Sequence, residues 1–331
     1  MTIAEIAKNL GVSKSTVSRA LSGKGRISEN TRLRIQTYVK EHNEAFLKLE
    51  ALPSAKTQNI GVVIPADAYN TSIPFFQECM LGICEAANLL KYDVLMIRGT
   101  AYDISGIQQL VEKRKVDGII LTRSMEGDRG LKYLTDIHFP TGLIGSCDYD
   151  EVIQVDTDNK EASHSLISML VDRGFRKFAL ITGDATYSVN VKRCQGFLNA
   201  LEQKHIPKEH QLFYSNVVNM EIIDSVLRDI INKRVECIVC GDDVLCTRIM
   251  SRMQAEGYRI PLDVSIVSLY NSTNLECFSP AVTAINISAK QLGNMIARQM
   301  IAHLDNHEYE HKTVLDYEIL FRKSADIACR I

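Results

Sequence analysis

The feature that most constrains the fold of this 331-residue chain is a regular alternation of apolar runs and amphipathic stretches, beginning at Asn59. Short apolar runs predict strands, and the stretches between most of them repeat apolar residues at helical spacing. This alternation predicts parallel sheets covered by helices on both faces. The predicted strands are 60–65, 92–98, 117–122, 141–145, 153–156, 177–182, 211–215, 236–241, 264–269, 282–285 and 314–321. The predicted helices are about 74–91, 103–115, 127–137, 159–173, 188–204, 220–234, 243–257 and 288–306.

This number of strands is large for one open sheet, and the pattern restarts near Asp158. The sequence therefore predicts two similar, doubly wound parallel α/β subdomains joined by several crossovers. Sheets of this kind bind ligands at the carboxyl ends of their strands. We expect a ligand in the cleft between the two subdomains.

The first 26 residues predict two short helices joined by a tight turn. Ile3, Ile6, Ala7 and Leu10 recur at helical spacing, so the first helix has one apolar face. Thr2 is a plausible N-cap for this helix. The head of the chain is therefore expected to be a small all-α domain.

The second helix is expected over about 14–21. Gly11 ends the first helix, since glycine adopts the left-handed conformation most easily, and Ser13 can cap the second. Lys14 and Arg19 then lie on the outer face among short hydroxyl side chains. This arrangement suits a helix that enters the major groove of DNA, where arginine can reach guanine O6 and N7.

Ser28 predicts the start of a third helix at about 29–42. Its apolar residues and one threonine are expected to complete a three-helix core: Thr31, Leu33, Ile35, Tyr38 and Val39.

Charge is distributed unevenly along the chain, although its formal net charge is only −2. Residues 1–48 carry nine Lys and Arg against four Asp and Glu, whereas the remainder carries 29 against 36. A basic head on an acidic body confines the attraction for phosphate to one end of the chain.

Three strings in the head are long and specific: Ile3-Ala-Glu-Ile-Ala7, Gly11-Val-Ser-Lys-Ser-Thr-Val-Ser-Arg-Ala-Leu-Ser-Gly-Lys24 and Ile27-Ser-Glu-Asn-Thr-Arg32. They closely resemble the helix-turn-helix head of the LacI family of transcription regulators. The resemblance implies that Lys14, Ser15 and Arg19 read bases. The full set of predicted DNA-contacting residues is Thr2, Ser13, Lys14, Ser15, Thr16, Ser18, Arg19, Ser22, Lys24 and Leu52.

The body also resembles the LacI family, and through it the periplasmic sugar-binding proteins. Matching strings include Thr57-Gln-Asn-Ile-Gly-Val-Val-Ile-Pro65, Val155-Asp-Thr-Asp-Asn159 and Arg193-Cys-Gln-Gly-Phe197. The resemblance implies three crossings between subdomains, near 156–158, 285–287 and 316–317. The expected domains are a helix-turn-helix head at 1–43, a linker at 44–58 and an effector-binding and dimerisation domain at 59–331. Its N-subdomain takes about 59–157 and 288–315, and its C-subdomain takes about 158–285 and 316–331.

Six residues that follow predicted strands are candidates for binding an effector: Phe75, Phe76, Asp148, Arg193, Asp242 and Asn271. The resemblance implies that Arg193 contacts the effector, and a guanidinium can hold hydroxyls, carboxylate or phosphate. Several of the others have a structural alternative. One phenylalanine can pack at a helix start, Asp148 can lie in a solvated loop, and Asp242 or Asp243 can cap the next helix. Asn271 stands where many relatives carry aspartate.

The linker departs from the family pattern. Relatives join head and body by a Tyr-x-Pro-Asn segment and a short helix that inserts a leucine into the minor groove. Residues 43–53 contain no Tyr-x-Pro-Asn sequence. Leu52 is the candidate for minor-groove insertion, although Pro53 disfavours helical geometry at Leu52.

Several other classes of protein are not expected. No apolar run reaches 18 residues, and the head leaves no room for a signal peptide, so we expect a cytoplasmic protein without a membrane span. The nine scattered cysteines, Cys237 and Cys240 included, are expected to be reduced core or surface thiols. No nucleophile elbow, phosphate-binding loop or zinc-binding helix motif is present, so we expect no enzyme, metal or cofactor.

The sequence therefore predicts a homodimeric regulator that binds a pseudo-palindromic operator in double-stranded DNA. A small-molecule effector in the cleft, a sugar or sugar derivative, would control it, and it would repress a carbohydrate-utilisation operon. The alternative is a cytosolic small-molecule binding protein whose operator binding is weakened or atypical because of its linker.

Overall fold

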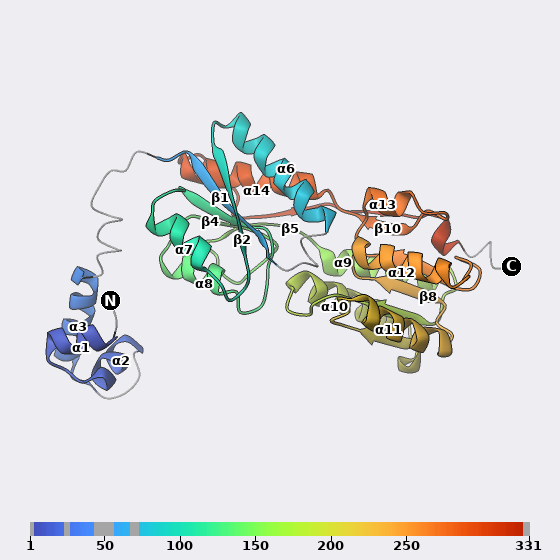
Figure 1. Ribbon diagram of the computed structural model, residues 1–331, viewed down its shortest axis with the longest axis horizontal. Helices are drawn as coiled ribbons and strands as arrows, with labels where there is room; N and C mark the ends of the chain where they lie inside the picture. The colour runs from blue at the N-terminus through green and yellow to red at the C-terminus, as the bar shows by residue number, and fades with distance from the viewer. Residues whose placement is uncertain (1–2, 23–26, 43–55, 67–72, 327–331) are drawn as a thin grey trace. The chain divides into compact units, whose positions relative to one another are not determined.

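The computed structural model describes residues 3–22, 27–42, 56–66 and 73–326. The chain forms two compact units, 1–56 and 57–331. We call them the head and the body and describe each by itself (Figure 1).

The described part of the head contains the helices α1 (Ile3–Leu10), α2 (Lys14–Ser22) and α3 (Glu29–His42). Helices this short are unstable alone, so they need a shared apolar core. That core consists of Ile6, Ala7, Val17, Ala20 and Ile35.

The side chain of Leu33 does not join this core and is 64% exposed, so that prediction was wrong. Leu33 and Ile35 are two residues apart, which places them about 200° apart around α3. Only one of the two can face α1 and α2, and it is Ile35.

Caps and a glycine set the helix boundaries of the head. Gly11 has a φ of 67°, in the left-handed region, and separates α1 from α2. The hydroxyl of Ser13 accepts a hydrogen bond from Thr16 N at 3.1 Å, and that of Ser28 accepts one from Thr31 N at 3.2 Å. Both predicted N-caps are confirmed.

The described part of the body contains two six-stranded sheets. The first has the strand order β11-β5-β4-β3-β1-β2 and the second β12-β10-β9-β8-β6-β7. The strands of the first sheet are β1 (Asn59–Pro65), β2 (Asp93–Gly99), β3 (Gly118–Leu121), β4 (Thr141–Ile144), β5 (Ile153–Thr157) and β11 (Lys312–Leu315). The strands of the second are β6 (Phe178–Ile181), β7 (Gln211–Tyr214), β8 (Cys237–Cys240), β9 (Ser265–Ser268), β10 (Thr283–Asn286) and β12 (Glu318–Leu320).

Each sheet lies between helices (Figure 1). The first lobe is the first sheet with α6 (Pro74–Leu89), α7 (Ser105–Glu112), α8 (Arg129–Asp136) and α14 (Ala289–Leu304). The second lobe is the second sheet with α9 (Asn159–Asp172), α10 (Ser188–Gln203), α11 (Met220–Asn232), α12 (Asp243–Ala255) and α13 (Thr273–Glu276). Two short 3-10 turns, Lys208–His210 and Lys323–Ala325, complete the described elements. The predicted fold class is confirmed.

Successive side chains of a strand point to opposite layers of helices. In β6, Phe178 and Leu180 pack in the cluster that includes α9 and α10, whereas Ile181 packs in the cluster of α11 and α12. Cys237 and Cys240 of β8 divide in the same way and are both buried thiols, as predicted.

The chain passes between the lobes after β5, after β10 and after β11. The single strand predicted over 314–321 was wrong, because β11 ends at Leu315 in the first sheet and β12 begins at Glu318 in the second. β12 pairs antiparallel with β10, whereas the other paired strands in the described sheets are parallel. An apolar run cannot reveal such a change of sheet, because both halves are extended and apolar.

Glycines allow the closest helix pair in each lobe to cross. A Cβ atom on Gly293 of α14 would lie 2.1 Å from Cys79 O of α6, and one on Gly82 of α6 would lie 2.0 Å from Lys290 O. The second lobe repeats this device, since a Cβ on Gly196 of α10 would lie 2.1 Å from Lys160 O of α9. These contacts with backbone leave no space for a methyl group.

We expect Gly293→Ala to lower the free energy of unfolding by about 3 kcal/mol or more, the upper part of the range for overpacking. The helix propensity of alanine, worth about 1 kcal/mol over glycine, does not offset a clash between two backbones. Urea denaturation followed by circular dichroism measures the change. Asn88→Ala, on the exposed face of α6, is the control and should change stability by less than about 0.5 kcal/mol. Equal stability of Gly293→Ala and the unmodified protein would contradict this close crossing.

Candidate functional site

The first candidate site is the outer face of α2 in the head. Lys14 and Arg19 are exposed on it, whereas Val17 and Ala20 face the core. The Ser13 and Thr16 hydroxyls lie 2.8 Å apart and hydrogen-bond each other at the start of the helix. The arrangement leaves one lysine and one arginine free to reach a groove from a firmly capped helix.

Other predicted DNA-contacting residues lie outside what the structure describes. Thr2, Lys24 and Leu52 are outside the described residues, as is the rest of the linker at 43–55. Ser15, Ser18 and Ser22 belong to α2, but their side chains are outside the description.

The second candidate site is a cavity of about 940 Å³, including space open to solvent, between the two lobes of the body. Its lining comes from the ends of strands and the first turns of helices in both lobes. The polar and charged residues of this lining are Thr122, Arg123, Ser124, Ser146, Asp156, Thr157, Asn159, Asp184, Ser188, Asn190, Lys192, Arg193 and Asp242. Such a mixture of donors and acceptors suits a polar small molecule.

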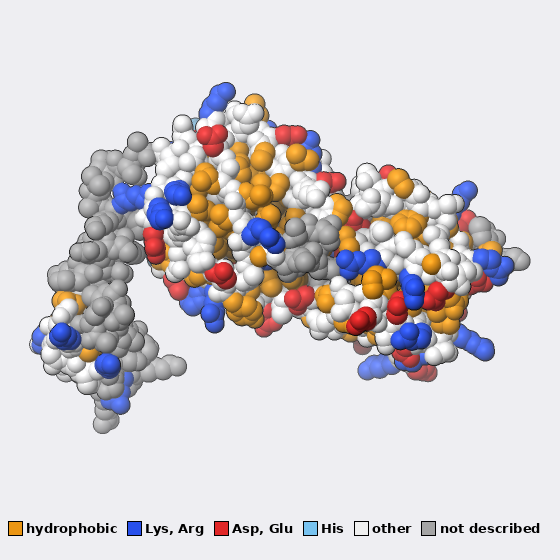
Figure 2. All heavy atoms as spheres, in the orientation of Figure 1, with side chains coloured by type: hydrophobic (Ala, Val, Ile, Leu, Met, Phe, Trp, Pro, Cys, Tyr) orange, Lys and Arg blue, Asp and Glu red, His pale blue; other side chains and the backbone are white. Residues whose placement is uncertain are grey.

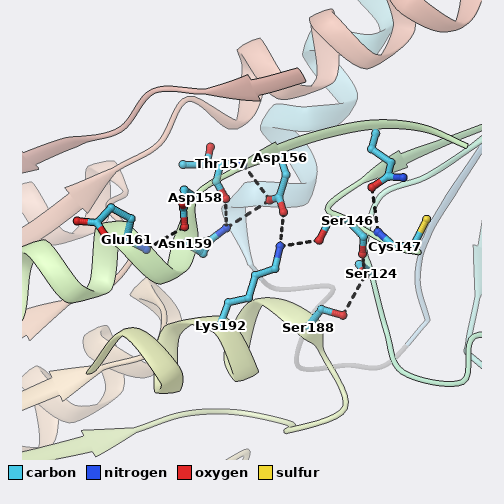
Figure 3. A network of polar contacts seen from close by, with 11 residues as sticks. Ser124, Ser146, Cys147, Asp156, Thr157, Asp158, Asn159, Glu161, Ser188 and Lys192 are labelled. Atoms are coloured by element: carbon cyan, nitrogen blue, oxygen red, sulfur yellow. Dashed lines mark hydrogen bonds and ion pairs between the residues drawn. The ribbon is translucent and has the colours of Figure 1, made fainter. Parts of the chain in front are cut away.

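An ion pair joins the lobes at this cavity (Figure 3). The Lys192 ammonium of α10 donates to Asp156 Oδ2 of β5 at 2.7 Å and to Ser146 Oγ at 2.6 Å. The Lys192 side chain is 30% exposed and the Asp156 side chain 18%. Partial burial and two oxygen partners make this pair stronger than an ordinary surface pair.

A second set of contacts ties the segment after β3 to the segment before α10. The hydroxyls of Ser124 and Ser188 lie 2.9 Å apart, as Figure 3 shows, and Ser188 N donates to Ser124 O at 3.1 Å. Glu126 N donates to Thr186 O at 3.0 Å, next to an antiparallel bridge between Met125 and Tyr187. The two lobes therefore contact each other directly at the cavity.

Arg193 lines the cavity from the second lobe and is buried. Its Nη1 donates to Gly241 O at 2.7 Å, at the end of β8. Burial lowers the pKa of the Arg193 guanidinium from its usual value, and the nearby Asp242 carboxylate opposes this shift only in part. The guanidinium therefore lies where water solvates it poorly.

Aromatic rings form one wall of the cavity. Phe75 lies edge-on to Phe76, with ring centroids 5.3 Å apart, and edge-on to Tyr270 at 5.7 Å. All three residues line the cavity, and both phenylalanines are in the first turn of α6. An aromatic wall of this kind can pack against the apolar face of a ring-shaped ligand.

Asp242 both lines the cavity and caps a helix. Its Oδ1 accepts a hydrogen bond from Leu245 N at 2.8 Å, at the start of α12. The neighbouring Asp243 is fully buried and does not line the cavity. Burial, with the charge of Asp242 as a smaller cause, raises the pKa of Asp243 to about 6.

Asp148 and Asn271 do not line the cavity. Asp148 is exposed in the loop after β4. The amide of Asn271 is occupied by protein partners: its Nδ2 donates to Glu276 and Asn286, and its Oδ1 accepts from Arg322 Nη1 at 2.9 Å. The structure therefore brings Phe75, Phe76, Arg193 and Asp242 together at the cavity and leaves these two apart.

Lys192, Asp156 and Arg123 line the cavity, although the sequence did not single them out. Arg123 follows the predicted strand 117–122 directly, so the rule that pointed to other strand ends also applied to it. Lys192 had no such signal, because its role depends on which residue of the first lobe lies opposite α10.

The structure adds two findings on metals and membranes. Within residues 3–22, 27–42, 56–66 and 73–326, no three His, Cys, Asp or Glu side chains form a group that could hold a metal ion. In the same ranges, no helix has the length and apolar character of a membrane-spanning segment.

Comparison with known proteins gives a match for the head and a match for the body. Residues 2–43 match the family described as bacterial regulatory proteins, lacI family, and residues 167–325 match the periplasmic binding protein-like domain. The HTH-type transcriptional regulator MalR of Staphylococcus xylosus is 29% identical over 315 residues, which cover 93% of this chain and 92% of the relative. The chain therefore combines a lacI-family helix-turn-helix head with a periplasmic binding protein-like domain, and its relatives are HTH-type transcriptional regulators.

Solved structures of LacI-family proteins share the fold. A probable maltose operon transcriptional repressor, malR, of Staphylococcus aureus superposes with a TM-score of 0.76 at 24% identity, covering 82% of this chain and 99% of that one. A complex of the transcriptional regulator CelR with cellobiose has a TM-score of 0.74 at 22% identity and covers 98% of this chain and 99% of that one.

The pair across the lobes can be tested by a double-mutant cycle with Lys192→Met and Asp156→Asn. We expect a coupling energy of about 1–2 kcal/mol, between the values for exposed and fully buried pairs. Urea denaturation of the two single variants and the double variant measures it. The control is the same cycle on an exposed pair, with Lys132→Met and Asp136→Asn, whose coupling energy should be less than about 0.5 kcal/mol. Equal coupling in both cycles would mean that the cavity does not strengthen the pair.

Asp243→Asn tests the buried carboxyl group. Because folding raises its pKa, the stability that this group contributes is present at low pH and is lost as the pH rises through about 6. The variant lacks this titration, so its stability relative to the unmodified protein should rise by about 2–3 kcal/mol between about pH 4 and pH 7. Denaturation at several pH values measures the difference, and a difference that stays constant over this range would contradict the prediction.

Proposed function

We propose that this protein belongs to the LacI family, that it represses a carbohydrate-utilisation operon and that a carbohydrate-derived effector in the cavity controls its affinity for DNA. One observation carries the proposal: a single chain joins a capped recognition helix to a body whose polar cavity lies between two lobes. A module that reads DNA and a module that can sense a small molecule are the two parts that an effector-controlled repressor requires.

In this proposal Lys14, Ser15 and Arg19 read base edges in the major groove. Six further residues contact the phosphate backbone and so position the helix: Thr2, Ser13, Thr16, Ser18, Ser22 and Lys24. Leu52 inserts into the minor groove. The proposed domains are the head at 1–43, the linker at 44–58 and the body at 59–331. The N-subdomain of the body takes about 59–157 and 288–315, and the C-subdomain about 158–285 and 316–331.

The effector is proposed to lie against Phe75 and Phe76 and to bond with Arg193 and Asp242. The relatives support a carbohydrate-derived effector, since one is a probable maltose operon repressor and another is complexed with cellobiose. Binding would change the contacts between the lobes, and operator affinity would follow by the coupling free energy between the two sites. A coupling of about 1–3 kcal/mol changes affinity about 5- to 150-fold.

A homodimer is proposed because two heads are needed to read a pseudo-palindrome. The body carries exposed apolar side chains that a second copy could cover. In the first lobe these are Leu81 and Leu89 of α6 and Met96 of β2, and Figure 2 shows hydrophobic side chains gathered over this part of the lobe. In the second lobe they are Phe213, Val218, Met220 and Ile222.

We further propose that the protein works in the cytoplasm and is not an enzyme. Its relatives are transcription regulators, and the reduced cysteines and basic head suit a DNA-binding protein inside the cell. The second candidate function is that of a small-molecule binding protein with weakened operator binding. The atypical composition of residues 43–53 favours it.

Arg19→Ala tests sequence-specific binding by the head. An operator is first selected from a pool of random duplexes with the full-length protein. We expect the variant to bind this operator about 5- to 150-fold more weakly, since a bidentate contact to guanine is worth about 1–3 kcal/mol. Fluorescence anisotropy at one fixed salt concentration measures the affinities for the operator and for random DNA.

Arg34→Ala is the matched control, because it removes the same charge from an exposed position on α3. Its affinities for the operator and for random DNA should change by the same factor. If the unmodified protein bound both DNAs equally, the second candidate function would replace the first.

A further inference from the structure

Two arginines face the cavity, one from each lobe. Arg123 lies two residues after the end of β3 in the first lobe, and Arg193 belongs to α10 in the second. Both are more than nine-tenths buried, with exposed fractions of 5% and 7%. Buried guanidinium groups are uncommon unless an acceptor or an anion accompanies them.

The protein supplies few acceptors to these two groups. Among the described residues, Arg123 has one acceptor, the thioether sulfur of Met125 at 2.9 Å from Nε, which is a weak acceptor. Within the same residues, Arg193 donates from Nη1 alone, to Gly241 O. Each guanidinium has five N–H donors, and both Arg123 Nη1 and Arg193 Nε are buried with no partner among the described residues.

The contrast with Lys192 shows that the shortage is specific to the arginines. Lys192 lines the same cavity and has both a carboxylate and a hydroxyl as partners. Neither Arg123 nor Arg193 forms an ion pair with any carboxylate in the described ranges.

The acidic residues of the lining are already engaged elsewhere. Asp156 binds Lys192, and Asp242 accepts from the first turn of α12. Asp184 accepts from Thr186 N and Oγ1, both at 2.8 Å. Burial lowers the pKa of Arg193 by more than the nearby carboxylates, Asp242 first, raise it.

We propose that the effector carries an anionic group, a carboxylate or a phosphate, for which Arg123 and Arg193 supply the N–H donors. This inference rests on the proposed function, because it names the chemical class of the effector in the same cavity. It assigns Arg123 as a specificity-determining residue that selects acidic sugar derivatives over neutral sugars.

The chemistry favours an anion over a hydroxyl. Carboxylate and phosphate oxygens accept charge-assisted hydrogen bonds from guanidinium groups, often in pairs. A neutral sugar can also accept hydrogen bonds, but it leaves both buried charges uncompensated. Carboxylate and phosphate present the same acceptor chemistry to the cavity, so direct comparison of the two is needed to tell them apart.

The experiment compares matched compounds on the full-length protein by calorimetry and by thermal unfolding. The probes are glucose, gluconate and glucose 6-phosphate, then cellobiose and cellobionate, and inorganic phosphate alone as the minimal anion. We expect at least one anionic member to bind at least about tenfold more tightly than its neutral partner, as charge-assisted hydrogen bonds imply. Comparing the affinities for gluconate and cellobionate with the affinity for glucose 6-phosphate distinguishes a carboxylate effector from a phosphate effector.

Arg123→Gln then tests the residue, since glutamine keeps a polar side chain but removes the charge. This substitution should lower the affinity for the anionic compound about 10- to 150-fold and change the affinity for its neutral partner by less than about threefold. Arg123→Lys should restore part of the loss, because a charged donor remains. Lys132→Gln, on the exposed face of α8, removes the same charge from the first lobe and should leave every affinity unchanged.

Three outcomes would overturn this inference. The neutral compounds could bind more tightly than the anionic ones, or Arg123→Gln could bind the anion as tightly as the unmodified protein does. The third outcome is that no anion, phosphate included, stabilises the protein. Operator binding is measured separately on the same preparations. If operator binding persists while the anions fail, only the effector class is wrong. If sequence-specific binding to DNA also fails, the proposed function itself is wrong.

Discussion

The common direction of the parallel strands is the constraint on which the rest of the body depends. Helices cover both faces of each sheet, so the polar groups at the carboxyl ends of the strands are left to meet at one edge. Arg123 follows β3, Ser146 follows β4 and Asp242 follows β8. The cavity is polar because it lies where buried apolar strands end, and it lies between the lobes because the chain crosses between them three times.

The contacts across the cavity suggest how a ligand could act on the body. Lys192 holds Asp156 and Ser146, and Ser124 meets Ser188, so the lobes already touch through hydrogen bonds that water or a ligand could replace. The helix crossings at Gly82, Gly293 and Gly196 bring two helices of each lobe together, backbone against backbone. We expect such tightly packed lobes, joined by exchangeable polar contacts, to move against each other rather than to distort internally.

Local chemistry accounts for the features that the sequence predicted well. Ser13 and Ser28 cap helices because a hydroxyl one residue before a helix satisfies a free backbone N–H, whatever the rest of the chain does. Asp242 follows β8 and Arg193 lies within α10, and the alternating pattern already implied the direction of both elements, so both residues reach the cavity. The prediction that Leu33 joins the core of the head was wrong for the opposite reason, since a single apolar residue within a helix does not reveal which face of the helix is buried.

The sequence by itself determined a three-helix head, a basic charge at that end and two α/β lobes, because caps, periodicity and strand length act over a few residues. Only the tertiary structure decided the partners across the cavity. Lys192 pairs with a carboxylate 36 residues away, and Asn271 is occupied by Arg322, 51 residues away. The two buried arginines share a cavity although 70 positions separate them. Such pairings depend on how the two sheets face each other, and no local sequence pattern predicts that arrangement.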